Sequence, residues 1–315
     1  MNEIGGYFSL ELKSGKHFHT NAINLNSARN CLEYILISKK YKHIYIPYYT
    51  CDSILEPITK HNISYTFYRI NENLEPKELP LLDDNECFLY TNYFGIKDCY
   101  IKQLTKQYNK NLIIDNAQSF YSIPIRGTDT IYSPRKFFGV SDGGYLYCEK
   151  QLDIKLEQDI SYKRFSHLIK RIDLGANAAF LDFRENDEKI SNEPIKRMSN
   201  LTQTILASVD YENAKEKRIN NFMYLHNKLK HINRLTIDDI NNFECPLVYP
   251  FFTDDQNLKS KLIENKIYVA TYWPNVFEWC NKYDFEYYLT NQLIALPIDQ
   301  RYGINEMKKI LEVIL

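Results

Sequence analysis

Hydrophobic residues near the start of the chain recur at the spacing of one helix face. The residues concerned are Ala28, Cys31, Leu32, Ile35 and Leu36. Positions i, i+3, i+4, i+7 and i+8 lie on one side of an α-helix, so the pattern predicts an amphipathic helix over residues 27–38. Asn26 or Ser27 can cap this helix, because a side-chain oxygen at the N-cap accepts a hydrogen bond from a free backbone N–H.

The next segments alternate short β-prone runs with helical patterns. Runs rich in β-branched and aromatic residues predict strands at residues 43–47, 65–68, 87–90, 112–114 and 130–132. A helix is predicted from about Cys51, and Gly143 and Gly144 lead into a strand at residues 145–147 that can run in the reverse direction. Strands alternating with helices are typical of βα units, so we expect an α/β fold with a mainly parallel sheet flanked by helices.

The pattern changes after about residue 150, where polar helical segments prevail. Helical spacing predicts a long helix from Leu201 to Leu229 and a closing helix over residues 305–315. Strand-like runs lie at residues 247–249 and 268–270. We therefore expect a large α/β domain over residues 1–200, and a connecting helix with a smaller α+β domain over residues 201–315.

Composition narrows the classes of partner. The 315 residues are 44% hydrophobic and 25% charged, which suits a folded chain, and 39 basic against 40 acidic residues give a net charge of −1. This balance offers no electrostatic reason to expect nucleic acid or an anionic membrane as a partner. No apolar run approaches the roughly 20 residues that span a bilayer, and the first residues lack a signal-peptide pattern.

The cysteines and histidines do not predict a metal site. Seven cysteines are scattered without a C-x-x-C pair, and His17 and His19 form the one close histidine pair, with no third ligand recognisable. Reduced thiols indicate a cytoplasmic protein, so we expect no metal, no membrane and a small-molecule ligand.

Two residues that could take part in catalysis follow predicted strands. Asp115 comes directly after the apolar run at residues 112–114, where side chains of an open α/β sheet meet a ligand crevice. Lys136 follows the run at residues 130–132 among proline, aromatic and glycine residues, which can desolvate its amine and lower the pKa. The alternatives are an Asx turn at Asp115 and a surface lysine beside Arg135.

Blocks of sequence in a fixed order carry a resemblance to a known family. They are Leu25–Arg29 opening a helix, Asp115–Gln118 after a strand, and Ser133–Lys136 followed by Gly143 and Gly144, with support from residues 46–51, 197–199 and 296–302. Asp115 precedes Lys136 by 136 − 115 = 21 residues. The chain resembles the DegT/StrS family of sugar aminotransferases, which belongs to the pyridoxal 5′-phosphate (PLP) dependent aspartate aminotransferase superfamily of fold type I.

The resemblance implies roles for these residues. Lys136 would hold PLP as a Schiff base and shuttle a proton between the substrate carbon and the cofactor, while Asp115 would keep the pyridine nitrogen protonated. Gln118 would contact the ring oxygen of the cofactor.

A phosphate site is implied as well. Ser27, Ala28 and Arg29 would offer backbone N–H groups at a helix N-terminus, and Ser133 would add a hydroxyl. Without a cofactor, Ser27 would be a plain N-cap and Arg29 a solvated helix residue.

The sequence departs from the family pattern at two places. Many members carry an aromatic ring over the cofactor where this chain has Cys51, so stacking would fall to Cys51 itself, or to Tyr48 or Tyr49. The spacing from Ser133 to Lys136 is also shorter than the commonest one.

The function implied is transfer of an amino group from an amino acid such as glutamate to a keto-sugar, nucleotide-linked, in surface-polysaccharide or secondary-metabolite biosynthesis. Family dehydratases characteristically carry histidine where Lys136 stands. Two alternatives stay open: a PLP-binding or regulatory protein of the same fold, and an aminotransferase for a small non-sugar carbonyl compound. The family also implies a homodimer with shared active sites, to which Arg197 could contribute.

Overall fold

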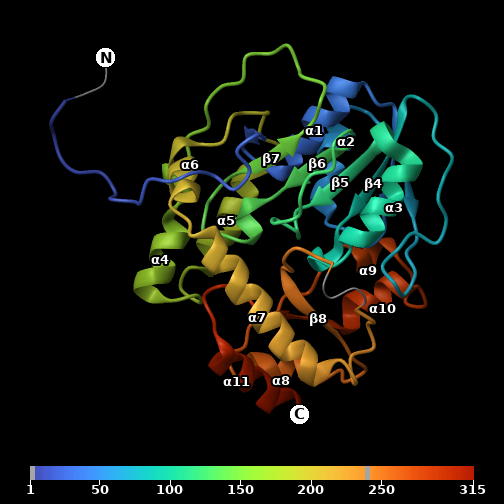
Figure 1. Cartoon of the computed structure of the whole chain (residues 1–315), viewed down its shortest axis with the longest axis vertical. Helices are drawn as coiled ribbons and strands as arrows, with labels where there is room; N and C mark the ends of the chain where they lie inside the picture. Colours follow the sequence, from blue (N-terminus) through green and yellow to red (C-terminus); the bar gives the residue numbers. More distant parts are fainter. Residues whose placement is uncertain (1–3, 238–241) are drawn as a thin grey trace.

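The computed structural model describes residues 4–237 and 242–315. Its main sheet has seven strands in the order β1-β7-β6-β5-β4-β2-β3 (Figure 1). The strands are β1 (Ile23–Leu25), β2 (His43–Pro47), β3 (Ser64–Tyr68), β4 (Glu86–Thr91), β5 (Leu112–Asn116), β6 (Asp129–Tyr132) and β7 (Gly144–Tyr147). The predicted strands of the first half are all confirmed, and the three-residue β1 was not foreseen.

The sheet is mainly parallel, as predicted. Strands β3, β2, β4, β5 and β6 pair in parallel, whereas β7 pairs antiparallel with both β6 and β1. The reverse direction predicted for residues 145–147 is therefore confirmed. Because parallel strands end at the same edge, the segments that follow β5 and β6 emerge side by side.

The strands bury both faces of the sheet. On β5, Ile113 faces the cluster formed by α1 (Ala28–Lys39) and α2 (Leu55–Lys60), while Leu112 and Ile114 face the cluster that includes α3 (Asp98–Tyr108). Side chains alternate across a strand, so a continuous apolar run is what a sheet covered on both sides requires. The short helices near this sheet are η1 (Asp52–Ile54), η2 (Tyr93–Gly95), η3 (Asn109–Asn111) and η4 (Pro134–Lys136).

The rest of the chain builds a second, smaller sheet and its helices. Strands β8 (Val248–Phe252) and β9 (Leu293–Pro297) pair antiparallel, and α7 leads from the main sheet to this part (Figure 1). The remaining helices are η5 (Tyr162–Arg164), α4 (Ser166–Leu174), α5 (Phe180–Ile190), α6 (Asn200–Ala207), α7 (Tyr211–Leu229), α8 (Leu258–Glu264), α9 (Val276–Trp279), α10 (Phe285–Gln292) and α11 (Ile304–Ile314).

Two predictions in the second half are wrong. The single helix expected from Leu201 to Leu229 is two helices, because Asp210 accepts a hydrogen bond from the backbone of Asn213 and starts α7 afresh. Residues 268–270 form no strand: Tyr268 is exposed while Val269 is buried, and neither has a strand partner. Alternating exposed and buried residues are not enough to form a strand, because a strand also needs a neighbouring strand to pair with.

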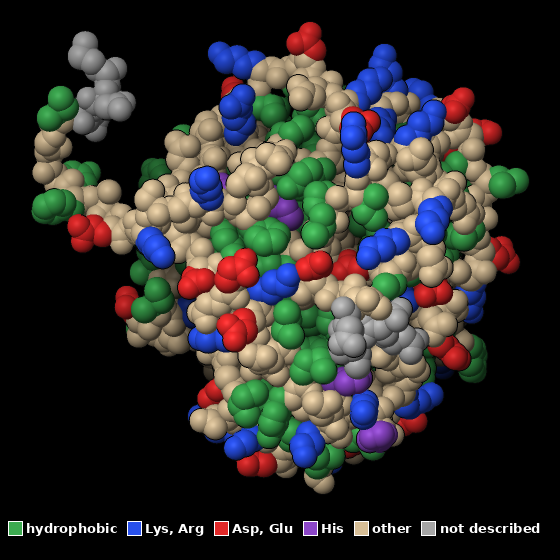
Figure 2. Space-filling model, in the orientation of Figure 1, with side chains coloured by type: hydrophobic (Ala, Val, Ile, Leu, Met, Phe, Trp, Pro, Cys, Tyr) green, Lys and Arg blue, Asp and Glu red, His purple; other side chains and the backbone are tan. Residues whose placement is uncertain are grey.

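The surface carries both charges. On the face shown in Figure 2, basic and acidic side chains are interspersed, which agrees with the balanced composition. Among the described residues, none of the helices has the length and apolar character needed to cross a membrane.

Candidate active site

Asp115 and Lys136 lie at the same edge of the main sheet. Asp115 lies near the carboxyl end of β5 and pairs with Ile131 of the parallel strand β6. Lys136 is the last residue of the short helix η4, which follows β6. The positive charge of Lys136 acts on the Asp115 carboxylate. The structure therefore brings together the two residues that the sequence placed after separate strands.

Asp115 is a largely desolvated carboxylate. Its Oδ1 accepts a hydrogen bond from the backbone N–H of Ala117 at 2.9 Å, and its other oxygen has no hydrogen-bond partner among the described residues. Burial raises the pKa of Asp115, while the Ala117 N–H and the charge of Lys136 oppose that rise. A cationic N–H donor would be stabilised beside this free oxygen.

Lys136 itself is exposed, so the predicted desolvation of its amine is wrong for the protein without ligand. The aromatic residues that suggested burial, Phe137 and Phe138, turn into the core and leave the lysine on the open side of the turn.

The turn is anchored by two residues that the sequence analysis missed. The carbonyl oxygen of Phe137 accepts hydrogen bonds from Gln300 Nε2 at 2.8 Å and from Arg218 Nη2 at 3.4 Å. Arg218 is 1% exposed, and its guanidinium lies 4.5 Å from the centre of the Phe137 ring. Helix α7 and the loop after β9 thus fix the backbone next to Lys136.

The N-terminus of α1 lies beside the lysine turn. Ser27 Oγ accepts a hydrogen bond from the Asn30 N–H at 3.1 Å and donates one to Asn30 Oδ1 at 2.5 Å, so its hydroxyl is committed to the cap. The backbone N–H groups of Ala28 and Arg29 remain for an anion, whereas that of Asn30 is already bonded to Ser27. Gly144 permits this arrangement, because a Cβ there would lie 2.5 Å from the Ser27 carbonyl oxygen. A Cβ at Gly143 would lie 2.9 Å from Pro134 of the lysine turn.

An open depression of about 450 Å³ adjoins these elements. Arg29, Asp52, Ser53 and Glu56 contribute to one wall, and Arg184 and Asp187 of α5 to the other. Asp187 also pairs with Arg135 at 2.5 Å, which ties α5 to the lysine turn.

Two polar groups, one on Arg29 and one on Ser133, have no hydrogen-bond partner among the described residues, and Arg29 also lines the depression. Arg29 Nε lies 3.6 Å from Glu56, but its Nη1 is buried without a hydrogen-bond partner. The Ser133 hydroxyl forms no hydrogen bond within the described part of the chain, although the residue is only 7% exposed. Both groups could bind an anion at the N-terminus of α1.

Gln118 and Cys51 have defined surroundings. Gln118 is 3% exposed, and its Oε1 accepts a hydrogen bond from the Phe94 N–H at 2.7 Å, which fixes the amide. Cys51 is partly exposed, and its Sγ accepts a hydrogen bond from Ser53 at 3.1 Å.

The neighbouring tyrosines are engaged elsewhere. Tyr48 stacks on Phe67 at 4.5 Å and is covered by Arg69, and Tyr49 is fully buried against Trp273. The suggestion that Tyr48 or Tyr49 could stack on a ligand is therefore wrong, and Cys51 remains.

A buried carboxylate, that of Asp142, holds the segment next to Gly143 in place. Asp142 accepts hydrogen bonds from the Ser199 N–H at 2.9 Å, from the Ser199 hydroxyl at 2.7 Å and from the Thr202 hydroxyl. These contacts join the segment before Gly143 to the N-terminus of α6. No local sequence pattern predicts this network, because Asp142 lies 57 or more residues before Ser199 and Thr202.

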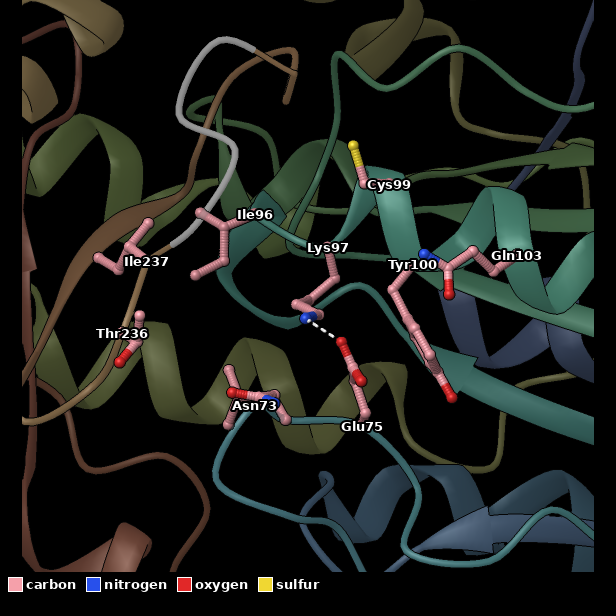
Figure 3. A pocket seen from close by; sticks show the side chains of 10 residues that line it. Asn73, Glu75, Ile96, Lys97, Cys99, Tyr100, Gln103, Thr236 and Ile237 are labelled. Carbon is pink, nitrogen blue, oxygen red and sulfur yellow. Dashed lines mark hydrogen bonds and ion pairs between the residues drawn. The ribbon is translucent and has the colours of Figure 1, made fainter.

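A smaller cavity of about 100 Å³ lies elsewhere, at the start of α3 (Figure 3). Its lining includes the ion pair between Lys97 and Glu75, at 2.7 Å, and Tyr100. None of the site residues expected from the sequence lines this cavity.

Comparison with known proteins gives the fold. No protein-family model matches the chain, and no curated protein matches it significantly. Among solved structures, a DegT DnrJ EryC1 StrS aminotransferase from Brucella abortus is 14% identical, with a TM-score of 0.61 over 93% of this chain and 84% of its own.

Two further solved structures are similar. The putative sugar aminotransferase Spr1654 from Streptococcus pneumoniae, in its PMP form, is 14% identical, with a TM-score of 0.62 over 93% of this chain and 86% of its own. DesI, solved with its TDP-sugar product, is 9% identical, with a TM-score of 0.64 over 93% and 79%. The chain thus has the fold of PLP-dependent aminotransferases, as the sequence predicted.

The residues at the sheet edge fit the cofactor of that fold. PLP needs an amine for its aldehyde, a carboxylate for its ring nitrogen and donors for its phosphate. Lys136 offers an accessible amine and Asp115 a free carboxylate oxygen. The orphaned Nη1 of Arg29, the free hydroxyl of Ser133 and the start of α1 offer donors for an anion.

Proposed function

We propose that this protein is a PLP-dependent aminotransferase that moves an amino group from an amino acid to a keto-sugar. The observation that carries the proposal is the convergence of an accessible lysine amine and a desolvated carboxylate at the ends of adjacent parallel strands. The fold, shared with sugar aminotransferases, supports it.

When bound, PLP would supply an electron sink for the carbanion formed at the substrate carbon. Lys136 would hold the cofactor and, once freed by the substrate amine, would accept a proton from the substrate carbon and return it at the cofactor's C4′. Asp115 would hold a proton on the ring nitrogen through its unpaired oxygen. Gln118, fixed by Phe94, would donate its amide N–H groups to the ring oxygen.

The phosphate of the cofactor would lie at the N-terminus of α1. The backbone N–H groups of Ala28 and Arg29 lie at the positive end of the helix dipole, which favours binding of an anion. The Ser133 hydroxyl and the free Nη1 of Arg29 would add hydrogen-bond donors. Ser27 contributes through its backbone, since its hydroxyl caps the helix.

We propose glutamate as the donor and a nucleotide-linked keto-sugar as the acceptor. Support comes from the solved neighbours, because DesI was solved with a TDP-sugar product and a PseC structure from Helicobacter pylori is described as an aminotransferase of pseudoaminic acid biosynthesis. A small non-sugar carbonyl compound is the alternative acceptor, and the same assay with a panel of ketoacids separates the two.

We further propose that the active protein is a homodimer. Helices α4 and α5 expose apolar side chains that a monomer leaves in water, among them Ile169, Ile172 and Leu181, at 51%, 85% and 77%. Arg197 is exposed, and its backbone pairs with Leu25 next to α1, so it could reach a site on the partner. Ile172→Lys is expected to shift the dimer to monomer in sedimentation velocity, and an unchanged dimer refutes this interface.

The test of the proposed activity is an absorbance spectrum with PLP, before and after glutamate. The wild-type protein is expected to show the band of the lysine-bound cofactor, and glutamate should convert it to the spectrum of the amine form. Lys136→Ala should lack the first band, while Lys102→Ala, an exposed lysine on α3, should match the wild type. A wild-type spectrum that stays that of free PLP contradicts the proposal.

A second candidate function is a PLP-binding or regulatory protein of the same fold. Cys51 favours it, because neither Tyr48 nor Tyr49 replaces the absent aromatic ring. In that case the lysine-bound band would form, but no amino acid would change it.

A further inference from the structure

The segment of residues 4–14, here called the N-terminal arm, lies outside the body of the molecule. All of its residues are exposed, and within the described part of the chain no hydrogen bond or ion pair joins it to other segments. In Figures 1 and 2 the arm extends into solvent on the side of α6. Tyr7, Phe8 and Leu10 are 98%, 93% and 66% exposed. A run of apolar side chains in water is typical of a segment that binds another surface.

The arm has the residue pattern of a β-strand. Its apolar and polar residues alternate over six positions: Phe8, Ser9, Leu10, Glu11, Leu12 and Lys13. Such alternation is typical of a strand with one buried face, because successive side chains of a strand point to opposite sides. Residues 8–14 nevertheless form no strand in the single chain. The arm therefore has the pattern of a strand but no sheet to join.

Strand β3 ends the main sheet and pairs on one side only. The Ser64 N–H donates to the Lys42 carbonyl at 3.1 Å, and the Tyr68 carbonyl accepts from the Tyr48 N–H at 3.0 Å, so both residues bond towards β2. Alternate residues of a parallel strand turn their N–H and C=O groups to opposite sides. The backbone groups of Tyr65 consequently face away from the sheet.

Tyr65 and Phe67 form the uncovered part of this edge. The next outward carbonyl, that of Arg69, already accepts a hydrogen bond from the Lys77 N–H at 2.8 Å. At the other end of the main sheet, β1 is covered by an isolated bridge to Arg197. Beside Tyr65 and Phe67 no strand lies within the described chain, so their outward backbone groups can pair with an added strand.

The side chains of β3 form an aromatic face and a polar face. The rings of Tyr65 and Phe67 lie 5.4 Å apart on one face. On the other face, Ser64 and Thr66 form hydrogen bonds with the ring of His43, at 2.7 and 3.0 Å. The arm is divided in the same way. A strand made by the arm would continue both faces, with its apolar side chains next to the aromatic rings.

The arm cannot reach β3 of its own chain. Its base is fixed at His17, which forms hydrogen bonds with Tyr145 of β7 at 2.8 Å and with the Gln203 carbonyl at 3.0 Å. Five strand spacings separate β7 from β3, or about 24 Å. The seven residues from His17 to Leu10 span about 25 Å at most when fully extended, which leaves no length for a path around the helices on both faces of the sheet.

From this match we infer that the N-terminal arm of one copy of the chain adds as a strand to β3 of a second copy. Residues 8–12 of the arm pair with the outward backbone groups of Tyr65 and Phe67. Neither the arm nor β3 belongs to α4 or α5, so this contact is separate from the interface proposed above for the homodimer. Because the uncovered edge is short, the contact forms at high protein concentration and leaves the dilute protein in the state that α4 and α5 set.

The first experiment measures, by fluorescence anisotropy, the binding of a labelled peptide with the sequence of residues 4–14 to the full chain. The peptide is expected to bind, and Leu10→Lys in the peptide should weaken binding at least tenfold. Tyr65→Pro in the chain removes one outward N–H and keeps the bonds to β2, so it should weaken binding to the same degree. Tyr162→Ala removes a ring that is 65% exposed in η5 and should leave binding unchanged.

Two results of this experiment overturn the inference. One is a peptide that does not bind, or that binds equally well with Leu10→Lys, and this result does not depend on whether Tyr65→Pro folds. The other is a folded Tyr65→Pro chain that binds the peptide as the wild type does, since the arm would then dock elsewhere.

The second experiment tests whether the contact joins two copies. Hydrogen exchange of the full chain is followed by mass spectrometry in dilute and in concentrated samples. The peptide that contains Tyr65 and Phe67 should exchange more slowly in the concentrated sample, and Leu10→Lys should abolish that difference. Protection that is equal at both concentrations, or that persists in Leu10→Lys, contradicts the inference. Neither experiment contains PLP, so neither result depends on the proposed aminotransferase activity.

Discussion

Replacing Arg218 by methionine tests how the lysine turn is held. Arg218 is buried, and its guanidinium donates hydrogen bonds to the Gln300 side chain at 2.8 Å, to the Leu247 carbonyl at 3.1 Å and to the Phe137 carbonyl at 3.4 Å. Burial lowers the pKa of Arg218, which reflects the cost of desolvating the charge. Methionine keeps most of the volume and removes both the donors and the charge.

The expected loss of stability follows from the hydrogen-bond acceptors that Arg218→Met leaves without a donor. The carbonyl oxygen of Leu247 and the amide oxygen of Gln300 lose this donor, at about 1–3 kcal/mol each, whereas the Phe137 carbonyl keeps its bond from Gln300. Relief of the buried charge offsets part of that cost. We expect Arg218→Met to lower the free energy of unfolding by about 3 kcal/mol, or the melting temperature by about 6 °C at about 2 °C per kcal/mol.

The assay is thermal unfolding, followed by circular dichroism, with Arg126→Met as the control. Arg126 is exposed in a loop, so that variant should melt with the wild type. Arg218→Lys should recover less than half of the loss, because an ammonium lacks the planar fork that reaches separate acceptors. If Arg218→Met unfolds within about 1 °C of the wild type, the guanidinium does not anchor the turn and the reasoning fails.

Further predictions concern Asp115, Asp142 and His19. Asp115→Asn should still allow covalent attachment of PLP at Lys136 but slow the glutamate step about 100-fold in stopped-flow absorbance, because an amide cannot hold the ring nitrogen protonated; an unchanged rate would contradict the role. Asp142→Ala should lower the free energy of unfolding by about 3 kcal/mol in urea titrations, since the Ser199 and Thr202 donors lose their acceptor, and a loss below about 1 kcal/mol would disprove the network's importance. Burial lowers the pKa of His19 to about 4, so the unfolded chain takes up the proton first and stability falls as the pH drops from about 6.5 to 4. His19→Gln should remove about 2.5 kcal/mol of the loss between pH 7 and pH 4.5, measured by urea midpoints, and an equal loss in both proteins would refute it.

Strands of the main sheet could be predicted from the sequence because each is a continuous apolar run between turn residues. The run before Asp115 is one example: Leu112, Ile113 and Ile114 are buried on alternate faces, as a sheet covered on both sides demands. The placement of Asp115 and Lys136 at one sheet edge followed from parallel strand order. Such features depend on local pattern and on topology alone.

Other parts depend on contacts between distant residues, which no local pattern records. In the sequence, Arg218 is one of several polar residues of a helix. Only the structure shows that it is buried against Phe137, 81 positions earlier. The exposure of Lys136 was missed for the same reason, because flanking aromatic residues do not reveal on which side of a turn they are buried. The groove of about 780 Å³ beside α11 likewise joins segments that are far apart in the sequence, within residues 171–180, 265–268 and 297–313.

The most direct test of the account is the site of covalent attachment. The protein is mixed with PLP and reduced with borohydride, and the modified peptide is located by mass spectrometry. The account predicts one pyridoxyl group per chain, on Lys136, with none on Lys136→Ala under the same conditions. Label spread over exposed lysines, or equal labelling of the variant, would contradict the claim that Lys136 and Asp115 form a cofactor site.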